Sequence, residues 1–469
     1  MKKSKSMLIG AMAVLAVGQG LMSSGVILPQ WSKNYKPRAE GIDGQLGPDQ
    51  LLFALAGFRE LIAGILWVQA DRFFETGNYD AILPIIRLVT LLDPKQIDVY
   101  STGMWHIGYN FTDEEQRSDR RYIPSALALG KEGATKNDYT YEMFFETGWM
   151  WYHKVQDDFP KAVDWFLQAQ EKKDMQQARK NVLGMAYQRN GQPDKALETY
   201  LRLYNESDAL LKKEQIYSHF QNKETLEKNA DNTLIRMIQR GWLAEQEGTF
   251  DQGSYDTKPP FDVQFSARVT VEEARVIRVE GFWGVRPVGT RVRFILRDSD
   301  YPDAIPGGML WDKTDTVSLD PPRDRTWAQD ELFVRNQRFN RKLDLSKDPT
   351  MYSFLQPEYT IEFYYNPRGA PPHIQDKFGW SGEGMTDKNF LRTDVREGSR
   401  VVFTQLTLTR DQILRRGEWA DKVPIVQTKN FIAPRNVRTE DEILVTPGML
   451  SEPLEPKLNK GERLGGGEN

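Results

Sequence analysis

The sequence predicts a multidomain α + β chain with an N-terminal transmembrane helix, an α-solenoid of helix pairs and a C-terminal antiparallel β-sandwich. Three observations predict this fold class. Residues 7–28 are uncharged, a pattern of small and aromatic residues recurs within residues 50–248, and apolar and polar residues alternate from Phe261 onward. A chain of 469 residues also exceeds what one hydrophobic core usually serves, so more than one domain is expected.

The N-terminus has the pattern of a signal anchor. Residues 1–6 carry three lysines, and the 22 residues of the run 7–28 include no charged side chain. This run is longer than a secretory h-region and matches the ~20 residues that a spanning helix needs. Because basic residues favour the cytoplasmic side, we expect a single-pass protein of the bacterial inner membrane with its bulk periplasmic or otherwise extracytoplasmic. Cleavage near the small residues Gly18, Gly20 and Gly25 is the open alternative, and residues 29–49 are expected to form a linker.

The stretch 181–200, NVLGMAYQRNGQPDKALETY, carries the strongest repeat signal. Six of its positions have residue types that suit the contact between two packed helices: Leu183, Gly184, Tyr187, Gly191, Ala196 and Tyr200. The small residues Gly184 and Ala196 let the helices touch, and the aromatic rings fill the space around that contact. Gly191 turns the chain, and Pro193 opens the second helix where a missing amide hydrogen costs nothing.

This pattern resembles the tetratricopeptide repeat (TPR), in which L-G-x2-Y in one helix is followed by A-x3-aromatic in the next. Weaker copies lie at residues 65–95 and 145–170, the second with two extra residues in its turn. The best copy departs from the family at Lys180, where Trp is common, and at Asp208, where Pro is common. The chain also resembles bacterial envelope proteins that carry this repeat behind one membrane helix. The resemblance implies a TPR-like array over residues 50–248 and an envelope location.

Beyond a linker at residues 249–260, the sequence changes to short alternating segments. Apolar residues occupy every second position from Phe261 to Val271, which predicts a half-buried strand. Similar runs occur at residues 274–282, 290–298, 359–365 and 399–410. They predict a β-sandwich over residues 261–432, immunoglobulin-like or jelly-roll-like. The tail 433–469 is poor in aromatic residues and rich in turn formers, so disorder is expected there.

Composition excludes several chemistries. The chain has no cysteine and only four histidines, no two of which have the i, i+4 spacing of a helical metal site. We therefore expect no cofactor, no metal and no enzymatic activity, and the net charge of −4 argues against nucleic acid as a partner. His106 and His153 are interpreted as packing or groove residues. Asp298, Asp300 and Asp303 are interpreted as a solvated turn, although their spacing could supply oxygen ligands to calcium.

The predicted function is a non-enzymatic, membrane-anchored scaffold that holds other envelope proteins through the concave face of the array, for instance in a secretion, pilus or surface-assembly complex. The resemblance to the TPR implies which first-helix positions face such a partner: Trp67, Asp71, Phe74, Glu75, Asn181, Met185, Gln188 and Arg189. The alternative is a carbohydrate- or polymer-binding protein that uses the sandwich as its reader. Exposed tryptophans at Trp283, Trp311 and Trp327 would favour that alternative.

Overall fold

The computed structural model describes most of the chain between residues 59 and 431. The described residues are 25, 59–75, 81–110, 113–114, 117–118, 120–156, 158–242, 248–249, 261–285, 289–300, 311, 315, 317, 325–347, 349–394 and 398–431. The chain divides into two compact units. The first, called the helical unit, comprises Met1–Tyr255, Asp300–Gln329 and Thr393–Ser399. The second, called the β unit, comprises Asp256–Ser299, Asp330–Arg392 and Arg400–Asn469.

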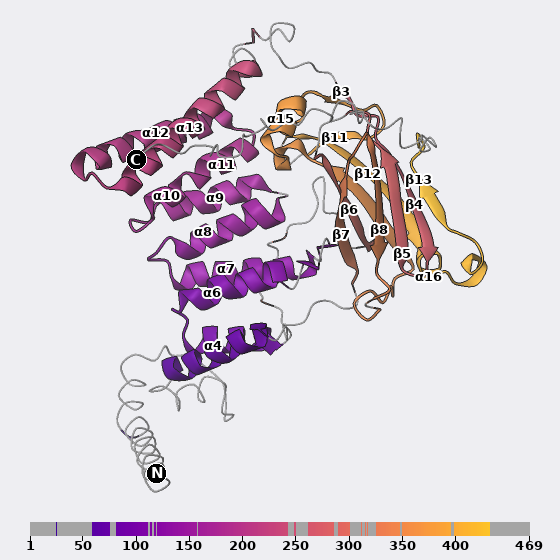
Figure 1. Ribbon diagram of the computed structural model, residues 1–469. Helices are drawn as coiled ribbons and strands as arrows, with labels where there is room; N and C mark the ends of the chain where they lie inside the picture. The colour runs from indigo at the N-terminus through magenta and orange to yellow at the C-terminus, as the bar shows by residue number, and fades with distance from the viewer. Residues whose placement is uncertain are drawn as a thin grey trace, which may run out of the picture. The chain divides into compact units, whose positions relative to one another are not determined.

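The helical unit contains a succession of helices in chain order (Figure 1). Its α-helices are α4 (Arg59–Glu75), α5 (Ile82–Leu92), α6 (Ile97–Trp105), α7 (Ile123–Lys136), α8 (Glu142–Trp149), α9 (Phe159–Gln170), α10 (Gln177–Lys180), α11 (Val182–Arg189), α12 (Pro193–Lys213) and α13 (Tyr217–Gln239). Two π-helical segments continue α6 and α8, namely η3 (His106–Asn110) and η5 (Met150–Val155). A 3₁₀ turn, η4 (Arg120–Tyr122), precedes α7, and the two-residue strands β1 (Asp113–Glu114) and β2 (Arg117–Ser118) pair antiparallel.

The helices form pairs that stack on one another. Helix α4 packs on α5, α6 on α7, α8 on α9 and α11 on α12, and α13 packs along α12. In the first pair, Arg59 at the start of α4 donates to the carbonyl of Leu91 near the end of α5 at 3.0 Å, so these two helices run antiparallel. Successive pairs also touch, since α6 contacts α8 and α9 contacts α11. The first helices of the second and third pairs, α6 and α8, are therefore neighbours.

Local sequence signals set where the second helices begin. Before α9, the side chain of Asp158 accepts a hydrogen bond from the Lys161 amide at 3.2 Å, and a proline occupies the first turn. Helix α12 likewise begins with Pro193. A capping carboxylate satisfies an amide that has no partner within the helix, and proline has no amide hydrogen to leave unsatisfied.

Glycines mark the closest contacts between paired helices. A Cβ atom built at Gly148 of α8 would lie 2.9 Å from the ring of Phe166 in α9, and one at Gly184 of α11 would lie 2.4 Å from the ring of Tyr200 in α12. Both rings are buried. Leu183, Ala186 and Ala196 are buried beside the second contact, whereas Tyr187 and Gly191 are half-buried. Burial also raises the pKa of the Tyr200 hydroxyl, as expected for a dry contact.

The β unit consists of two main sheets. The smaller sheet has the order β13-β4-β5-β8, and within the unit the larger sheet has the order β7-β6-β9-β12-β11. The strands are β3 (Phe261–Asp262), β4 (Ser266–Glu273), β5 (Val276–Phe282), β6 (Arg291–Asp298), β7 (Trp327–Phe333), β8 (Arg338–Asp344), β9 (Glu358–Tyr365), β10 (Met385–Thr386), β11 (Leu391–Thr393), β12 (Arg400–Thr409) and β13 (Ile425–Gln427). The short helical segments are η7 (Pro367–Gly369), α15 (Pro372–Phe378), α16 (Arg410–Leu414) and η8 (Gly417–Trp419).

An aromatic core lies between the two sheets. Phe265, just before β4, contacts the rings of Phe339 in β8 and Phe363 in β9, and Phe363 also contacts Phe294 in β6. These rings come from both sheets, so the sheets pack face to face. The alternating residues Ala267, Val269 and Val271 are buried on the same inner side of β4. Apolar alternation therefore corresponds to one buried sheet face.

The alternating segment 261–271 is two strands rather than one. Gln264 has a φ of 45°, in the left-handed region, and it separates β3 from β4. The Gln264 amide is held by the Asp262 carboxylate at 3.1 Å, and β3 pairs parallel with β10 instead of continuing into the small sheet. The break keeps Val263 and Phe265 buried while it redirects the chain.

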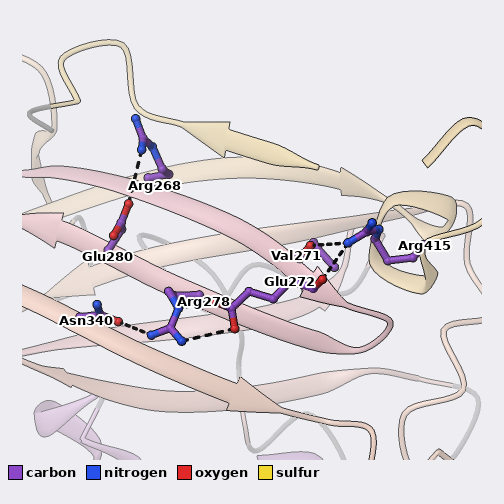
Figure 2. A network of polar contacts seen from close by, with 7 residues as sticks. All are labelled: Arg268, Val271, Glu272, Arg278, Glu280, Asn340 and Arg415. Carbon is purple, nitrogen blue, oxygen red and sulfur yellow. Dashed lines mark hydrogen bonds and ion pairs between the residues drawn. The ribbon is translucent and has the colours of Figure 1, made fainter. Parts of the chain in front are cut away.

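Arginines organise the outer face of the smaller sheet (Figure 2). Arg278 of β5 donates to the Glu272 carboxylate of β4 and, at 2.9 Å, to the amide oxygen of Asn340 in β8. Arg415, in the left-handed region with a φ of 54°, donates to the carbonyls of Val271 and Glu272 at 3.2 and 2.7 Å. The network therefore joins three strands and the end of α16 through hydrogen bonds of its arginine side chains.

The predicted fold class and location need one correction. Both included a membrane-spanning helix, but within the part of the chain that the structure describes, no helix is long and apolar enough to cross a bilayer. The predicted span 7–28 lies outside the described residues, apart from Gly25, as do the linkers 29–49 and 251–260 and the tail 433–469. The transmembrane helix and the inner-membrane location inferred from it are therefore withdrawn.

Enlarging Ala196 should destabilise the helical unit, because its side chain is fully buried at the contact between α11 and α12. We expect Ala196→Leu to lower the free energy of unfolding by about 1–3 kcal/mol through overpacking. The control is Glu198→Leu, an exposed position on the same helix, which should stay within about 0.5 kcal/mol of wild type. Denaturant unfolding followed by circular dichroism measures both, and equal midpoints for Ala196→Leu and wild type would contradict the packing.

The Arg278 guanidinium holds the pKa of Glu272 below its ordinary value through their hydrogen bond. A carboxylate whose pKa is depressed by folding adds stability above its unfolded pKa, and this stability is lost as the pH falls through the folded pKa. Arg278→Met should therefore move the Glu272 pKa upward in an NMR titration of side-chain carboxylates. Arg268→Met is the control, because Arg268 pairs with Glu280 instead. An unmoved Glu272 pKa in Arg278→Met would refute the assignment.

Candidate functional site

The first group of predicted partner residues lies on α4. Phe74 is exposed and its ring centroid lies 4.5 Å from that of His106 in η3, on the next first helix. Trp67 is half-buried and Glu75 is exposed at the end of the helix. The backbone of Asp71 belongs to α4, but its side chain lies outside the described residues. Phe74 is therefore the member of this group that the structure brings against another first helix.

The second group lies on and just before α11. Met185 is exposed, and Asn181 and Arg189 are half-buried. Gln188 is engaged within the fold, since it donates to the hydroxyls of Tyr200 at 3.3 Å and Thr233 at 2.9 Å and accepts from Arg236 at 3.2 Å. Its amide joins α11 to α12 and α13. Gln188 therefore acts in packing, and Met185 is the more open side chain.

A continuous row of four rings lies between these groups, on the first helices of the second and third pairs. We call Trp105, Tyr109, His153 and Trp149 the aromatic row. Trp105 stacks on Tyr109 with centroids 4.2 Å apart, and Trp149 stacks on His153 at 5.4 Å with an interplanar angle of 7°. The Tyr109 hydroxyl lies 2.8 Å from Nδ1 of His153, which joins the two stacks. The row therefore crosses from one helix to its neighbour.

Part of this row faces solvent. The Trp105 side chain is 48% exposed and His153 is also exposed, whereas Tyr109 and Trp149 are half-buried. Trp and Tyr combine a large apolar surface with few rotatable bonds, which makes them frequent anchors at protein interfaces. The exposed end at Trp105 and the exposed His153 thus give the row surface that a partner could reach.

Two π-helical segments align the stacked rings. Trp105 and Trp149 are the last residues of α6 and α8, and their stacking partners follow four positions later in η3 and η5. In a π-helix each amide bonds the carbonyl five residues back, and side chains at i and i+4 lie on one face, as they do in an α-helix. Gln156 donates to the Trp151 carbonyl at 3.0 Å in this pattern and ends η5 with a φ of 55°.

Glycine and two cations support the row from behind. A Cβ atom at Gly108 of η3 would lie 2.5 Å from the methyl carbon of Met150 in η5, so the glycine leaves room for the Met150 side chain. The Lys154 ammonium lies 5.1 Å from the centre of the Tyr109 ring, a cation–π contact. The Arg120 guanidinium donates to the carbonyls of Lys154 and Val155, both at 2.9 Å. These contacts fix where Tyr109 and His153 meet.

The aromatic row offers ring surfaces for binding. The stacked rings can hold apolar, aromatic or cationic side chains by contact and by cation–π attraction. Among the residues that the structure describes, no group of three or more His, Asp or Glu side chains could hold a metal ion. Of the three aspartates interpreted as a solvated turn, Asp298 is buried at the end of β6, Asp300 pairs with Arg325 at 2.6 Å, and Asp303 lies outside the described residues.

Sequence reasoning missed the row and named its one histidine, His153, only as a packing or groove residue. Its signal is an aromatic pair at i, i+4 in two successive first helices, Trp105 with Tyr109 and Trp149 with His153. In an ordinary α-helix such pairs often lie in a core, so the pattern alone does not predict a surface.

The tryptophans that would favour a polymer-binding sandwich are buried. Trp283 is 0% exposed, and Trp311 and Trp327 are each 1% exposed. A stacking platform for sugar rings needs exposed aromatic faces. These three residues therefore provide none, and the polymer-binding alternative loses the observation that would have favoured it.

Comparisons with known proteins show no family for this chain. No family model matches it, and no curated protein matches it. Among solved structures, one described as "Crystal structure of MamA protein" aligns at 16% sequence identity, covering 39% of this chain and 95% of that chain, with a TM-score of 0.24. A likeness at this TM-score carries no argument, so the conclusions below depend on the geometry of the chain itself.

The link between the two halves of the row can be tested by removing one oxygen. Tyr109→Phe keeps the ring stacked on Trp105 but deletes the hydroxyl that meets Nδ1 of His153. We expect a changed His153 ring-nitrogen signal in long-range ¹H–¹⁵N NMR and a loss of about 0.5–1.5 kcal/mol in unfolding free energy.

The control for this substitution is Tyr152→Phe in the same π-helical segment. The Tyr152 ring packs against Phe159 and Phe166, so its loss of a hydroxyl should leave the His153 signal in place. A His153 signal that is identical in wild type and Tyr109→Phe would show that the two side chains do not meet in solution.

Proposed function

We propose that the chain is a non-enzymatic protein-interaction scaffold whose helical unit binds a partner protein through the aromatic row. The observation that carries this proposal is the row itself, which is a set of stacked rings that spans two neighbouring first helices and is exposed at Trp105 and His153. Helical-repeat proteins commonly bind partners on the face formed by successive first helices. The TPR-like spacing of Gly148–Phe166 and Gly184–Tyr200 supports this comparison.

The exposure of Trp105 favours a role in binding over a role in packing alone. Close contacts within the pairs α8–α9 and α11–α12 are made by Gly148 and Gly184 against buried rings. Trp105 is not needed for them, because about half of its side chain faces solvent, at 48% exposed. A large aromatic side chain that is held rigidly by a stack yet remains accessible loses little conformational entropy on binding.

The test is site-specific photo-crosslinking of the full chain in its native cells. A benzophenone amino acid at Trp105 should yield a discrete crosslinked protein. The same amino acid at Leu201 of α12 is the matched control, because that residue is also 48% exposed but lies on a second helix. Leu201 should not yield that product.

The captured protein then allows a quantitative measurement. With the purified partner, Trp105→Ala should weaken binding by at least about tenfold, as expected for an aromatic hot spot. Leu201→Ala should leave the affinity within about twofold. Identical crosslinked products at both positions, or an affinity unchanged by Trp105→Ala, would count against the proposal.

A further inference from the structure

Trp311, far along the sequence, belongs to the helical unit and contacts Arg120, which holds the end of η5. Residues 300–329 follow β6 and lead into β7, yet they group with the helices. Within this unit Trp311 is buried, and the Arg120 guanidinium lies 5.4 Å from the centre of its ring. The neighbouring Arg121 donates to the Arg325 carbonyl at 2.5 Å. Two consecutive arginines before α7 therefore contact the same segment.

Arg120 also holds the end of η5. One of its terminal nitrogens donates to the carbonyls of Lys154 and Val155, the last two residues of that π-helical segment. Carbonyls at a helix end lack partners within the helix, and a charged donor satisfies them strongly. Lys154 lies over Tyr109, and His153 precedes it in the chain. The Arg120 side chain thus connects Trp311 to the end of η5. The neighbouring side chains of His153 and Lys154 both contact Tyr109.

We propose that Trp311 is a positioning residue for the aromatic row, and that its seating on Arg120 regulates how well the row binds. The proposal rests on the proposed function of the row. A guanidinium is planar, so a ring at cation–π distance from it, as Trp311 is from Arg120, limits the directions in which it can donate. With Trp311 in place, Arg120 points both donations at η5 and holds His153 against Tyr109. With Trp311 displaced, Arg120 loses this restraint and the end of η5 loosens.

This coupling works in both directions. If a seated Trp311 strengthens partner binding at the row, a bound partner must favour the seated state of Trp311 by the same free energy. Trp311 is therefore a regulatory residue of the helical unit, because anything that displaces its ring from Arg120 weakens the row.

A second contact between residues 300–329 and α7 supplies the control. Lys131 of α7 pairs with Asp315 at 2.5 Å, but both side chains are largely exposed, at 54% and 76%. Exposed ion pairs of this kind contribute little to stability. Lys131→Met should therefore remove a contact to the segment without affecting η5.

The first measurement is hydrogen–deuterium exchange of the full chain by mass spectrometry. In Trp311→Ala, peptides that cover residues 151–156 should exchange faster by on the order of tenfold, whereas α9 and α11 should keep their protection. Arg120→Lys should reproduce this local increase, because lysine keeps the charge but has no planar guanidinium for the Trp311 ring to restrain. Trp311→Phe keeps a ring over Arg120 and should stay close to wild type, as should Lys131→Met.

Two exchange results would overturn the inference. One is unchanged exchange at residues 151–156 in Trp311→Ala. The other is an equal increase in exchange across all helices of Trp311→Ala and Trp311→Phe, which would show that Trp311 only stabilises the fold.

The second measurement separates the inference from the function on which it rests. Photo-crosslinking from position 105 should fall several-fold in Trp311→Ala and remain unchanged in Lys131→Met. A crosslink that persists unchanged in Trp311→Ala overturns the regulation by Trp311 but leaves the partner site in place. If the parent chain gives no specific crosslink at all, the proposed function fails, and the regulatory role of Trp311 is rejected with it.

Discussion

The helical unit depends on contacts in which a glycine of one helix lies directly against an aromatic ring of its partner. At Gly148 and Gly184 there is no room for even one more carbon atom next to Phe166 and Tyr200. Close-packed interiors tolerate such changes poorly, so these positions set the distance between paired helices. The distance within each pair in turn decides which helices of successive pairs become neighbours.

The aromatic row is a consequence of that spacing. It forms because α6 and α8 contact each other and because both change from α-helical to π-helical geometry at their last turn. Each tryptophan stacks on the ring four residues later, and Gly108 leaves room for the Met150 side chain of the neighbouring segment. A π-helical turn is less stable than an α-helical one and is often found at functional sites. Arg120, which holds the end of one segment, shows how the fold stabilises this geometry.

Sequence patterns predicted the local features of this chain and missed the long-range ones. The residue types at Gly184, Ala196 and Tyr200 depend on contacts within one helix pair, so they follow a readable spacing. Alternation from Phe261 to Val271 likewise reflects one buried face, although the positive φ of Gln264 breaks the strand in a way that alternation does not reveal. The contact between Arg121 and Arg325 joins residues 204 positions apart, and no local pattern encodes it.

The candidate site shows the same limit. Phe74 and Met185, two of the predicted partner residues, are exposed on first helices. The aromatic row was not predicted, because it depends on a hydrogen bond between two helices and on which rings the fold leaves exposed. The apolar N-terminal run gave a membrane helix that the described part of the chain does not contain. Hydropathy reports composition only, whereas a binding surface depends on which side chains the fold leaves accessible.

The most direct test of the account is a footprint of the bound partner on the full chain. Hydrogen–deuterium exchange, compared with and without the captured protein, should show new protection concentrated at residues 105–110 and 149–156, with the β unit unchanged. Protection confined to the strands of the β unit, for example residues 266–282, would contradict the assignment of partner binding to the aromatic row.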